Sequence, residues 1–297
     1  MLSSNISTIN LKDNRILGYA EFGDLEGHPV FYFTGGTISG IFAQVLHPLA
    51  LQVGARLIAP DRPGVGWSGF QPGRTIGDWP NDVVALADSL GIGRFAVVSE
   101  SGGAPYAAAC ALKMPERLTA AAIVSGISPF DAPNAFEGMS IANRFSALLM
   151  QRAPSWLLKA FYWPVVRMSR RDPEKLHPQL RRSVRGMAAV DQAIAAAPEF
   201  QQALLAAFCA AFQQGSRGPV LDIKLCGQPW GSWLQDIHMP VQLWHGDADR
   251  NAPVAMARYL ESKIPQCRAT FYANEGHVSV MANHGREIFQ KLVLEIP

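Results

Sequence analysis

The chain has 297 residues, of which 48% are apolar, and a formal net charge of +2. That apolar content excludes a disordered chain, and the nearly balanced charge gives no general attraction to nucleic acid. No apolar run approaches the roughly 18 residues that a membrane span needs, and residues 1–14 show no signal peptide. We therefore expect a soluble, cytoplasmic protein without a membrane span and without nucleic acid as a partner.

The first 129 residues alternate between short apolar runs and helix-like segments. Apolar runs that are buried on both faces, with helices between them, indicate a parallel sheet covered on each side. The predicted strands are 15–23, 28–36, 54–66, 95–100 and 118–126, and the predicted helices are 75–90 and 105–114.

The pattern changes between residues 130 and 236, where helix formers, aromatic residues, methionine and arginine replace the strand-like runs. Strand patterns return at 240–247 and 268–276, with helices expected at 253–264 and 282–294. We therefore predict one α/β core domain, formed by 1–129 and 237–297. A helical cap, residues 130–236, interrupts it.

The stretch "VVSESGG", residues 97–103, places two serines where a strand meets a helix. A sharp strand-to-helix turn exposes its central side chain, and it needs small residues two positions before and after that residue. Ser101 has Ser99 and Gly103 at those positions, whereas Ser99 has the branched Val97 before it. The spacing thus favours Ser101 as a nucleophile, with the Gly102 N–H at a helix N-terminus as an oxyanion donor. The alternative is an ordinary turn with solvated serines.

An acid and a base follow later in the chain, each just after a predicted strand. Asp249 lies in "WHGDADRNAP" and His277 in "NEGH". The carboxyl ends of strands in an open α/β sheet border its ligand crevice, so both side chains are expected near Ser101. Taken singly, the aspartate is equally typical of a turn or helix cap, and the histidine of a structural role. The order Ser, Asp, His is the one that an α/β-hydrolase uses.

With these motifs in place, the chain resembles the α/β-hydrolase superfamily, in particular its capped bacterial esterase-like members. The resemblance covers nearly the whole chain, most weakly in the cap, and five stretches carry it: "YFTGG", "LIAPDRPGVGWS", "VVSESGG", "WHGDADRNAP" and "EGH". It implies a mostly parallel central sheet flanked by helices, with the cap between strands 6 and 7.

The resemblance also implies roles for individual residues. Ser101 attacks a carbonyl, His277 serves as base and then acid, and Asp249 orients the imidazole. Gly36 is the second oxyanion donor by its place in the loop after the third strand. Thr34 stands there in place of the family's usual histidine.

The implied activity is hydrolysis of a carboxylic ester of a small, fairly apolar substrate, with no cofactor and no metal. Cleavage of a C–C bond, a lactone or an amide on the same triad remains open, as does a non-catalytic small-molecule binder. The four cysteines are widely spaced and are expected to be reduced thiols. Oligomeric state, monomer or homodimer, is left open.

Other polar and aromatic residues are expected to have structural roles or have two open interpretations. Glu100 is expected beneath the site as a hydrogen-bonded carboxylate, and Asp61 and Arg62 are expected to be structural. A basic segment, residues 166–186, reads as a solvated helical face or as a means of steering an anionic substrate or carrier. Four tryptophans are expected either to line a pocket under the cap or to pack between cap and core: Trp156, Trp163, Trp230 and Trp233.

Two aspartates compete for the role of triad acid. Asp247 directly follows the strand end and is suited to bracing the turn through an Asx-type hydrogen bond. Asp249 lies two residues later, at the crest of the loop, and the family pattern places its acid there. We therefore predict a hydrogen bond of 2.6–3.2 Å between Asp249 and His277.

Overall fold

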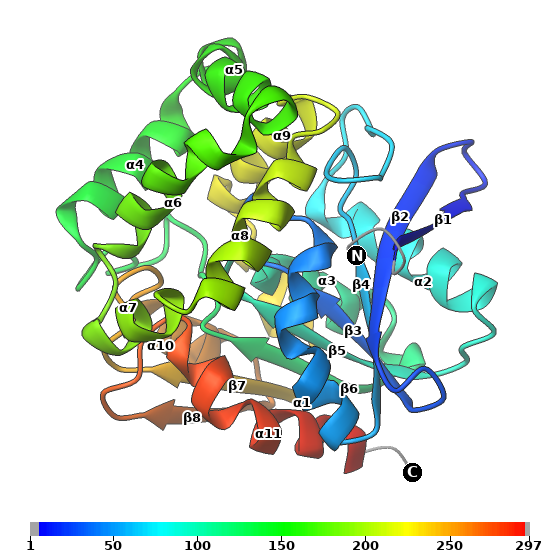
Figure 1. Cartoon of the computed structure of the whole chain (residues 1–297). Helices are drawn as coiled ribbons and strands as arrows, with labels where there is room; N and C mark the ends of the chain where they lie inside the picture. Colours follow the sequence, from blue (N-terminus) through cyan, green and yellow to red (C-terminus); the bar gives the residue numbers. More distant parts are fainter. Residues whose placement is uncertain (1–5, 295–297) are drawn as a thin grey trace.

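The computed structural model describes residues 6–294, so the first five residues of the segment tested for a signal peptide lie outside it. An eight-stranded mixed sheet forms its centre, in the order β1-β2-β4-β3-β5-β6-β7-β8 (Figure 1). β1 and β2 pair antiparallel, as do β2 and β4, and all other pairs are parallel. The strands are Ile6–Asn10 (β1), Ile16–Gly23 (β2), His28–Phe33 (β3), Ala55–Pro60 (β4), Phe95–Glu100 (β5), Leu118–Val124 (β6), Val241–Gly246 (β7) and Cys267–Tyr272 (β8).

Helices cover both faces of this sheet, which explains why its central strands are apolar throughout. One apolar cluster joins the sheet to α2 (Trp79–Ser89), α3 (Ala104–Lys113) and α10 (Val254–Lys263). A second cluster joins the opposite face to α1 (His47–Gln52) and α11 (Ser279–Leu294). The expected α/β class with a mostly parallel sheet is therefore confirmed.

Six helices are inserted between β6 and β7, as expected for the cap: α4 (Ile141–Arg152), α5 (Ser155–Arg171), α6 (His177–Val184), α7 (Ala189–Ala195), α8 (Pro198–Ala211) and α9 (Arg217–Gly227). Figure 1 shows α4 and α5 on the outer side of the cap, with α8 and α9 between them and the sheet. A separate apolar cluster that includes Leu158, Tyr162, Leu205 and Phe212 joins all of these helices except α7.

Two segments were not predicted. β1 is an edge strand whose residues are half-buried or exposed, so it carries no apolar run that would mark it. The 3-10 helix Gly40–Leu46 and the short α1 lie in a stretch to which no element was assigned. In residues 6–294 no single helix is long and apolar enough to cross a membrane. Taken together, α7 and α8 have the length and composition of a membrane span, but the two helices are bent by 82° where they meet.

Candidate active site

Ser101 lies at the sharp turn between β5 and α3. Its φ is +51°, a left-handed conformation that is strained for a residue with a Cβ. The approach of strand and helix is close enough to require glycine at Gly103, where a Cβ would lie 2.4 Å from the Phe33 carbonyl oxygen. Ser99 is fully buried, and its hydroxyl donates to the Ala122 carbonyl at 3.3 Å. Of the two serines, Ser101 is half-buried rather than fully buried, and it has the strained geometry that a nucleophile at such a turn adopts.

The predicted hydrogen bond between Asp249 and His277 is present. Nδ1 of His277 lies 2.7 Å from Oδ2 of Asp249, and the loops after β7 and β8 supply the two side chains. The other carboxylate oxygen accepts the backbone N–H groups of Asn251 and Ala252, at 2.8 and 2.9 Å. Asp249 is thus fixed by its own loop and holds one edge of the imidazole, which leaves Nε2 as the nitrogen for proton transfer.

Asp247 is bonded elsewhere. Its carboxylate accepts the backbone N–H of Asn274 at 2.7 Å, so it braces the loop after β7 against the loop after β8. The expected bracing role is present, but it acts across two loops and not within its own turn. Of the two candidate acids, Asp249 is the one hydrogen-bonded to His277.

Three carboxylates influence the charge state of His277. Burial by itself would lower the pKa of this imidazole, but Asp249, through charge and hydrogen bond, and then Asp191 and Glu100 outweigh burial and raise the pKa above its ordinary value. A protonated His277 is thereby stabilised, which is what a general base requires after it has accepted a proton.

The loop after β3 lies directly against Ser101. A Cβ on Gly35 would be 2.6 Å from the Ser101 Cβ and 3.2 Å from its Oγ, so no larger residue fits there. Gly36 has a positive φ of +47° and open space beside it, and its nitrogen lies 3.0 Å from where a Cβ of Gly102 would stand. The backbones of the two predicted oxyanion donors are therefore neighbours. The position crowded by Ser101 is Gly35, whereas no atom beyond the adjoining residues lies within 4 Å of where a Cβ of Gly36 would stand.

Thr34 and Arg62 fix the conformation of that loop. The Thr34 hydroxyl donates to the Ile38 carbonyl at 2.9 Å and closes the turn. Arg62 donates to the carbonyls of Thr34 and Gly36, both at 2.6 Å. The loop that lacks the family's histidine is thus held by a buried arginine, in keeping with the structural role expected of Arg62.

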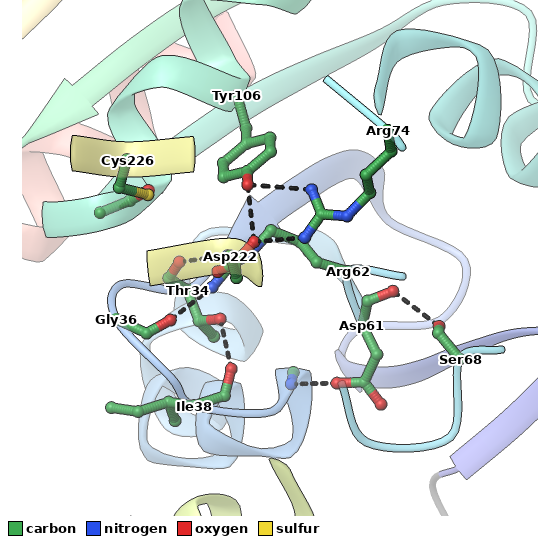
Figure 2. A network of polar contacts seen from close by, with 12 residues as sticks. Thr34, Gly36, Ile38, Asp61, Arg62, Ser68, Arg74, Tyr106, Asp222 and Cys226 are labelled. Atoms are coloured by element: carbon green, nitrogen blue, oxygen red, sulfur yellow. Dashed lines mark hydrogen bonds and ion pairs between the residues drawn. The ribbon is translucent and has the colours of Figure 1, made fainter. Parts of the chain in front are cut away.

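Arg62 belongs to a buried network that crosses from core to cap (Figure 2). Asp222, on α9, accepts from Arg62 at 2.8 Å, from Arg74 at 2.7 Å and from the Tyr106 hydroxyl at 2.6 Å. Burial would raise the pKa of Asp222, but the two guanidinium groups lower it below the ordinary value. One turn later on α9, Cys226 lies 3.5 Å from the Gly102 carbonyl oxygen. The cap therefore contacts the backbone on both sides of the predicted oxyanion hole.

A second cap carboxylate holds the histidine loop. Asp191, on α7, is fully buried and accepts the backbone N–H groups of His277, Val278 and Ser279 at 2.8, 2.9 and 3.0 Å. A Cβ on Gly276 would lie 2.1 Å from its Oδ2. Asp191 thus accepts the free backbone N–H groups at the N-terminus of α11, a role that a residue of the helix's own chain end usually fills.

Sequence reasoning missed Asp191, Asp222, Arg74 and Tyr106. One signal was available, because Asp222 shares a buried face of α9 with Leu225, three residues later, and an acid on an apolar face requires a buried partner. Glu100 has the hydrogen-bonded role that was expected: it is half-buried, accepts a hydrogen bond from the Tyr32 hydroxyl, and its pKa is raised by desolvation.

The tryptophans do not form the aromatic pocket that was considered. Trp156 and Trp163 are 70% and 62% exposed on α5, on the outside of the cap. Trp230 is buried in the core cluster that includes α3, and Trp233 packs against it. Packing is therefore the correct interpretation for Trp230 and Trp233, and neither interpretation holds for the other two. The four cysteines are free, and no cluster of metal-binding side chains occurs among residues 6–294.

Comparisons with known proteins agree with this architecture. Residues 29–159 match the model of the alpha/beta hydrolase fold family. A solved esterase from Rhodococcus sp. ECU1013 superimposes with a TM-score of 0.68 at 20% identity, over 98% of both chains. A thermophilic esterase from Thermogutta terrifontis gives 0.64 at 19% identity, over 98% of this chain and 100% of the other. The chain therefore has the alpha/beta hydrolase fold, and its residues 29–159 are similar to that family.

A local sequence match points to a more particular relative. Over 59 residues the chain is 32% identical to the pimeloyl-[acyl-carrier protein] methyl ester esterase of Aromatoleum aromaticum. The match spans 20% of this chain and 24% of that relative, about a quarter of its length.

Proposed function

We propose that the protein is a serine hydrolase that cleaves a carboxylic ester of a small, fairly apolar substrate. The observation that carries this proposal is the strained Ser101 at the end of β5, combined with the Asp249–His277 hydrogen bond at the ends of β7 and β8. The esterase names among the similar proteins support the ester bond as the target. We further propose a cytoplasmic location.

The proposed reaction uses the chain's own groups. Ser101 Oγ attacks the carbonyl carbon while Nε2 of His277 takes the hydroxyl proton, and the oxyanion accepts hydrogen bonds from the N–H groups of Gly36 and Gly102. Collapse expels the alcohol, which receives the proton from His277. Water then attacks the acyl-enzyme with the same base, and the acid leaves.

A fluorophosphonate probe tests the nucleophile. Ser101→Ala should abolish covalent labelling, and Ser99→Ala is the matched control because its hydroxyl is buried against Ala122 and should not react. Labelling that persists in Ser101→Ala would refute the assignment. Turnover of an ester, a lactone, an amide and a 1,3-diketone then separates the alternative reactions, and a purely binding protein would neither label nor turn over any of them.

The triad acid is tested with two asparagine variants. Asp249→Asn should lower ester turnover by up to roughly 10⁴, because the imidazole is then held in the wrong tautomer. Asp247→Asn removes only the charge from the side chain that braces Asn274, so it should keep most activity. The opposite ranking of the two variants would show that the acid is wrongly assigned.

A further inference from the structure

The outer side of the cap carries a concentration of exposed apolar side chains. In residues 6–294, eleven large apolar residues are exposed, and seven of them lie within the 23-residue stretch 141–163: Ile141, Phe145, Leu149, Trp156, Leu157, Phe161 and Trp163. An apolar surface of this density on a protein marks a site of interaction with a partner or a lipid surface.

On α5, aromatic and basic side chains share the solvent face. Trp156, Lys159, Trp163, Arg167 and Arg170 follow one another at helical spacings of three or four residues, and all five are exposed. The opposite face, with Leu158, Tyr162 and Val165, is buried in the cap's apolar cluster. The two tryptophans of the exposed stripe are therefore not part of that packing, whereas Arg170 at its end donates to the Gln213 carbonyl of the cap at 2.7 Å.

The charge of this region is strongly positive. Residues 141–185 contain ten lysines and arginines but two acidic residues, a net charge of +8, while the whole chain has +2. The remaining residues therefore sum to −6. A second copy paired through this same face would bring a like charge to it, so charge complementarity favours an anionic partner.

We propose that the outer side of α4 and α5 binds an anionic lipid bilayer. Exposed tryptophans next to lysine and arginine suit the headgroup region, where indole rings insert and cations meet phosphate. An acidic protein would satisfy the charges but would leave the paired tryptophans without a corresponding apolar environment. The inference does not depend on the proposed ester hydrolysis, since its measure is binding.

The position of α4 relates this surface to the candidate site. Asn143, in the first turn of α4, donates to Oδ1 of Asn251 at 2.8 Å, and Asn251 donates its backbone N–H to Asp249. The apolar row Ile141, Phe145 and Leu149 therefore begins next to the loop that carries the predicted triad acid.

Co-sedimentation of the full chain with vesicles tests the proposal. We expect binding to vesicles of phosphatidylglycerol and phosphatidylcholine, little binding to phosphatidylcholine alone, and a blue shift of tryptophan fluorescence on binding. The double variant Trp156→Ala/Trp163→Ala and the double variant Lys159→Glu/Arg167→Glu should each weaken binding by about tenfold or more. Two independent variants keep the test valid if one of them folds poorly.

The matched control is Leu25→Ala/Leu51→Ala, which removes two large apolar side chains of comparable exposure elsewhere on the surface. It should bind as the unaltered chain does. The proposal would be overturned if the chain bound neither kind of vesicle, or if all variants bound vesicles equally. It would also be overturned if the chain bound no vesicles but dimerised with increasing concentration and the tryptophan variant abolished this dimerisation. A further outcome would point to an acidic protein as the partner and overturn the proposal. In that outcome the tryptophan variant and the unaltered chain bind soluble polyglutamate equally well, and neither prefers vesicles.

Discussion

The inner and outer sides of the cap are built from opposite kinds of residue. Where the cap meets the core, it buries two carboxylates, Asp191 and Asp222, each with several hydrogen bonds. On its outer side it exposes Trp156 and Trp163. Buried acids and exposed indoles both reverse the usual distribution of residues. The acids have hydrogen-bond partners in the core, whereas the indoles lie on the surface, where Arg167 stacks over the Trp163 ring at 5.8 Å.

The two inner carboxylates hold different parts of the candidate site. Asp191 binds three backbone N–H groups of the histidine loop, while Asp222 reaches the oxyanion loop through Arg62. The cap is thus part of the framework that positions the predicted catalytic groups. Four substitutions test this contrast between the two sides, in order of decreasing effect.

The largest effect is expected at Asp222. Asp222→Ala leaves the guanidinium groups of Arg62 and Arg74 buried without their anion, and removing one partner of such a set costs about 3–5 kcal/mol of the free energy of unfolding. Denaturant titration measures this loss. Asp236→Ala, at an exposed acid of the same cap, is the control and should change stability little. Equal stability of the two variants would show that the cap is not anchored through this network.

The backbone contact between cap and core is tested at Gly218. Its Cβ in Gly218→Ala would lie 2.0 Å from the Gly64 carbonyl oxygen, so α9 must move away from the core, at a cost of about 1–3 kcal/mol. Gly227→Ala on the same helix is the control, since its Cβ would meet Gln151 at an ordinary 3.5 Å. Thermal melting of both variants measures the difference, and a destabilisation confined to Gly227→Ala would contradict this account.

Asp191 is expected to affect the chemistry of His277 as well as its position. Asp191→Asn should lower kcat for a soluble ester by about tenfold, equivalent to roughly 1.4 kcal/mol, with little change in KM. Because the Asp191 charge helps to raise the pKa of His277, its removal lowers that pKa. A neutral base then persists to lower pH, and the acid limb of the kcat/KM profile shifts to lower pH.

The pH profile separates positioning from a merely structural effect at Asp191. Asp247→Asn is the control, because it likewise neutralises a carboxylate that accepts a backbone N–H in the same pair of loops, that of Asn274. It should leave the acid limb where it is. If kcat of Asp191→Asn falls but the acid limb of its kcat/KM profile does not shift, the Asp191 carboxylate only shapes the loop.

The smallest effect is expected on the outer side. Trp156→Ala/Trp163→Ala removes only exposed surface, so stability should change by less than about 0.5 kcal/mol per residue and turnover of a soluble ester should stay the same. Trp230→Ala, at a buried indole, should instead cost about 3–5 kcal/mol. Substantial destabilisation by the outer pair would show that these indoles pack against the protein after all.

By itself, the sequence determined the alternation of strands and helices, the insertion between β6 and β7, and the choice of Ser101 over Ser99. These features depend on local sterics and periodicity, which neighbouring residues encode. The Asp249–His277 hydrogen bond was also predictable, because the carboxyl ends of β7 and β8 lie at one edge of the sheet. The catalytic roles of these residues stay predictions.

Only the tertiary structure decided how the cap is attached. Asp191 bonds to residues 86 to 88 positions away, and Asp222 to Arg62, 160 positions away. Nothing in the local pattern selects such partners, since they depend on how six helices fold back over the sheet. The side of the cap on which each tryptophan lies was undecided for the same reason: helical spacing groups Trp156 with Trp163 but does not say which face of α5 the rest of the cap will cover.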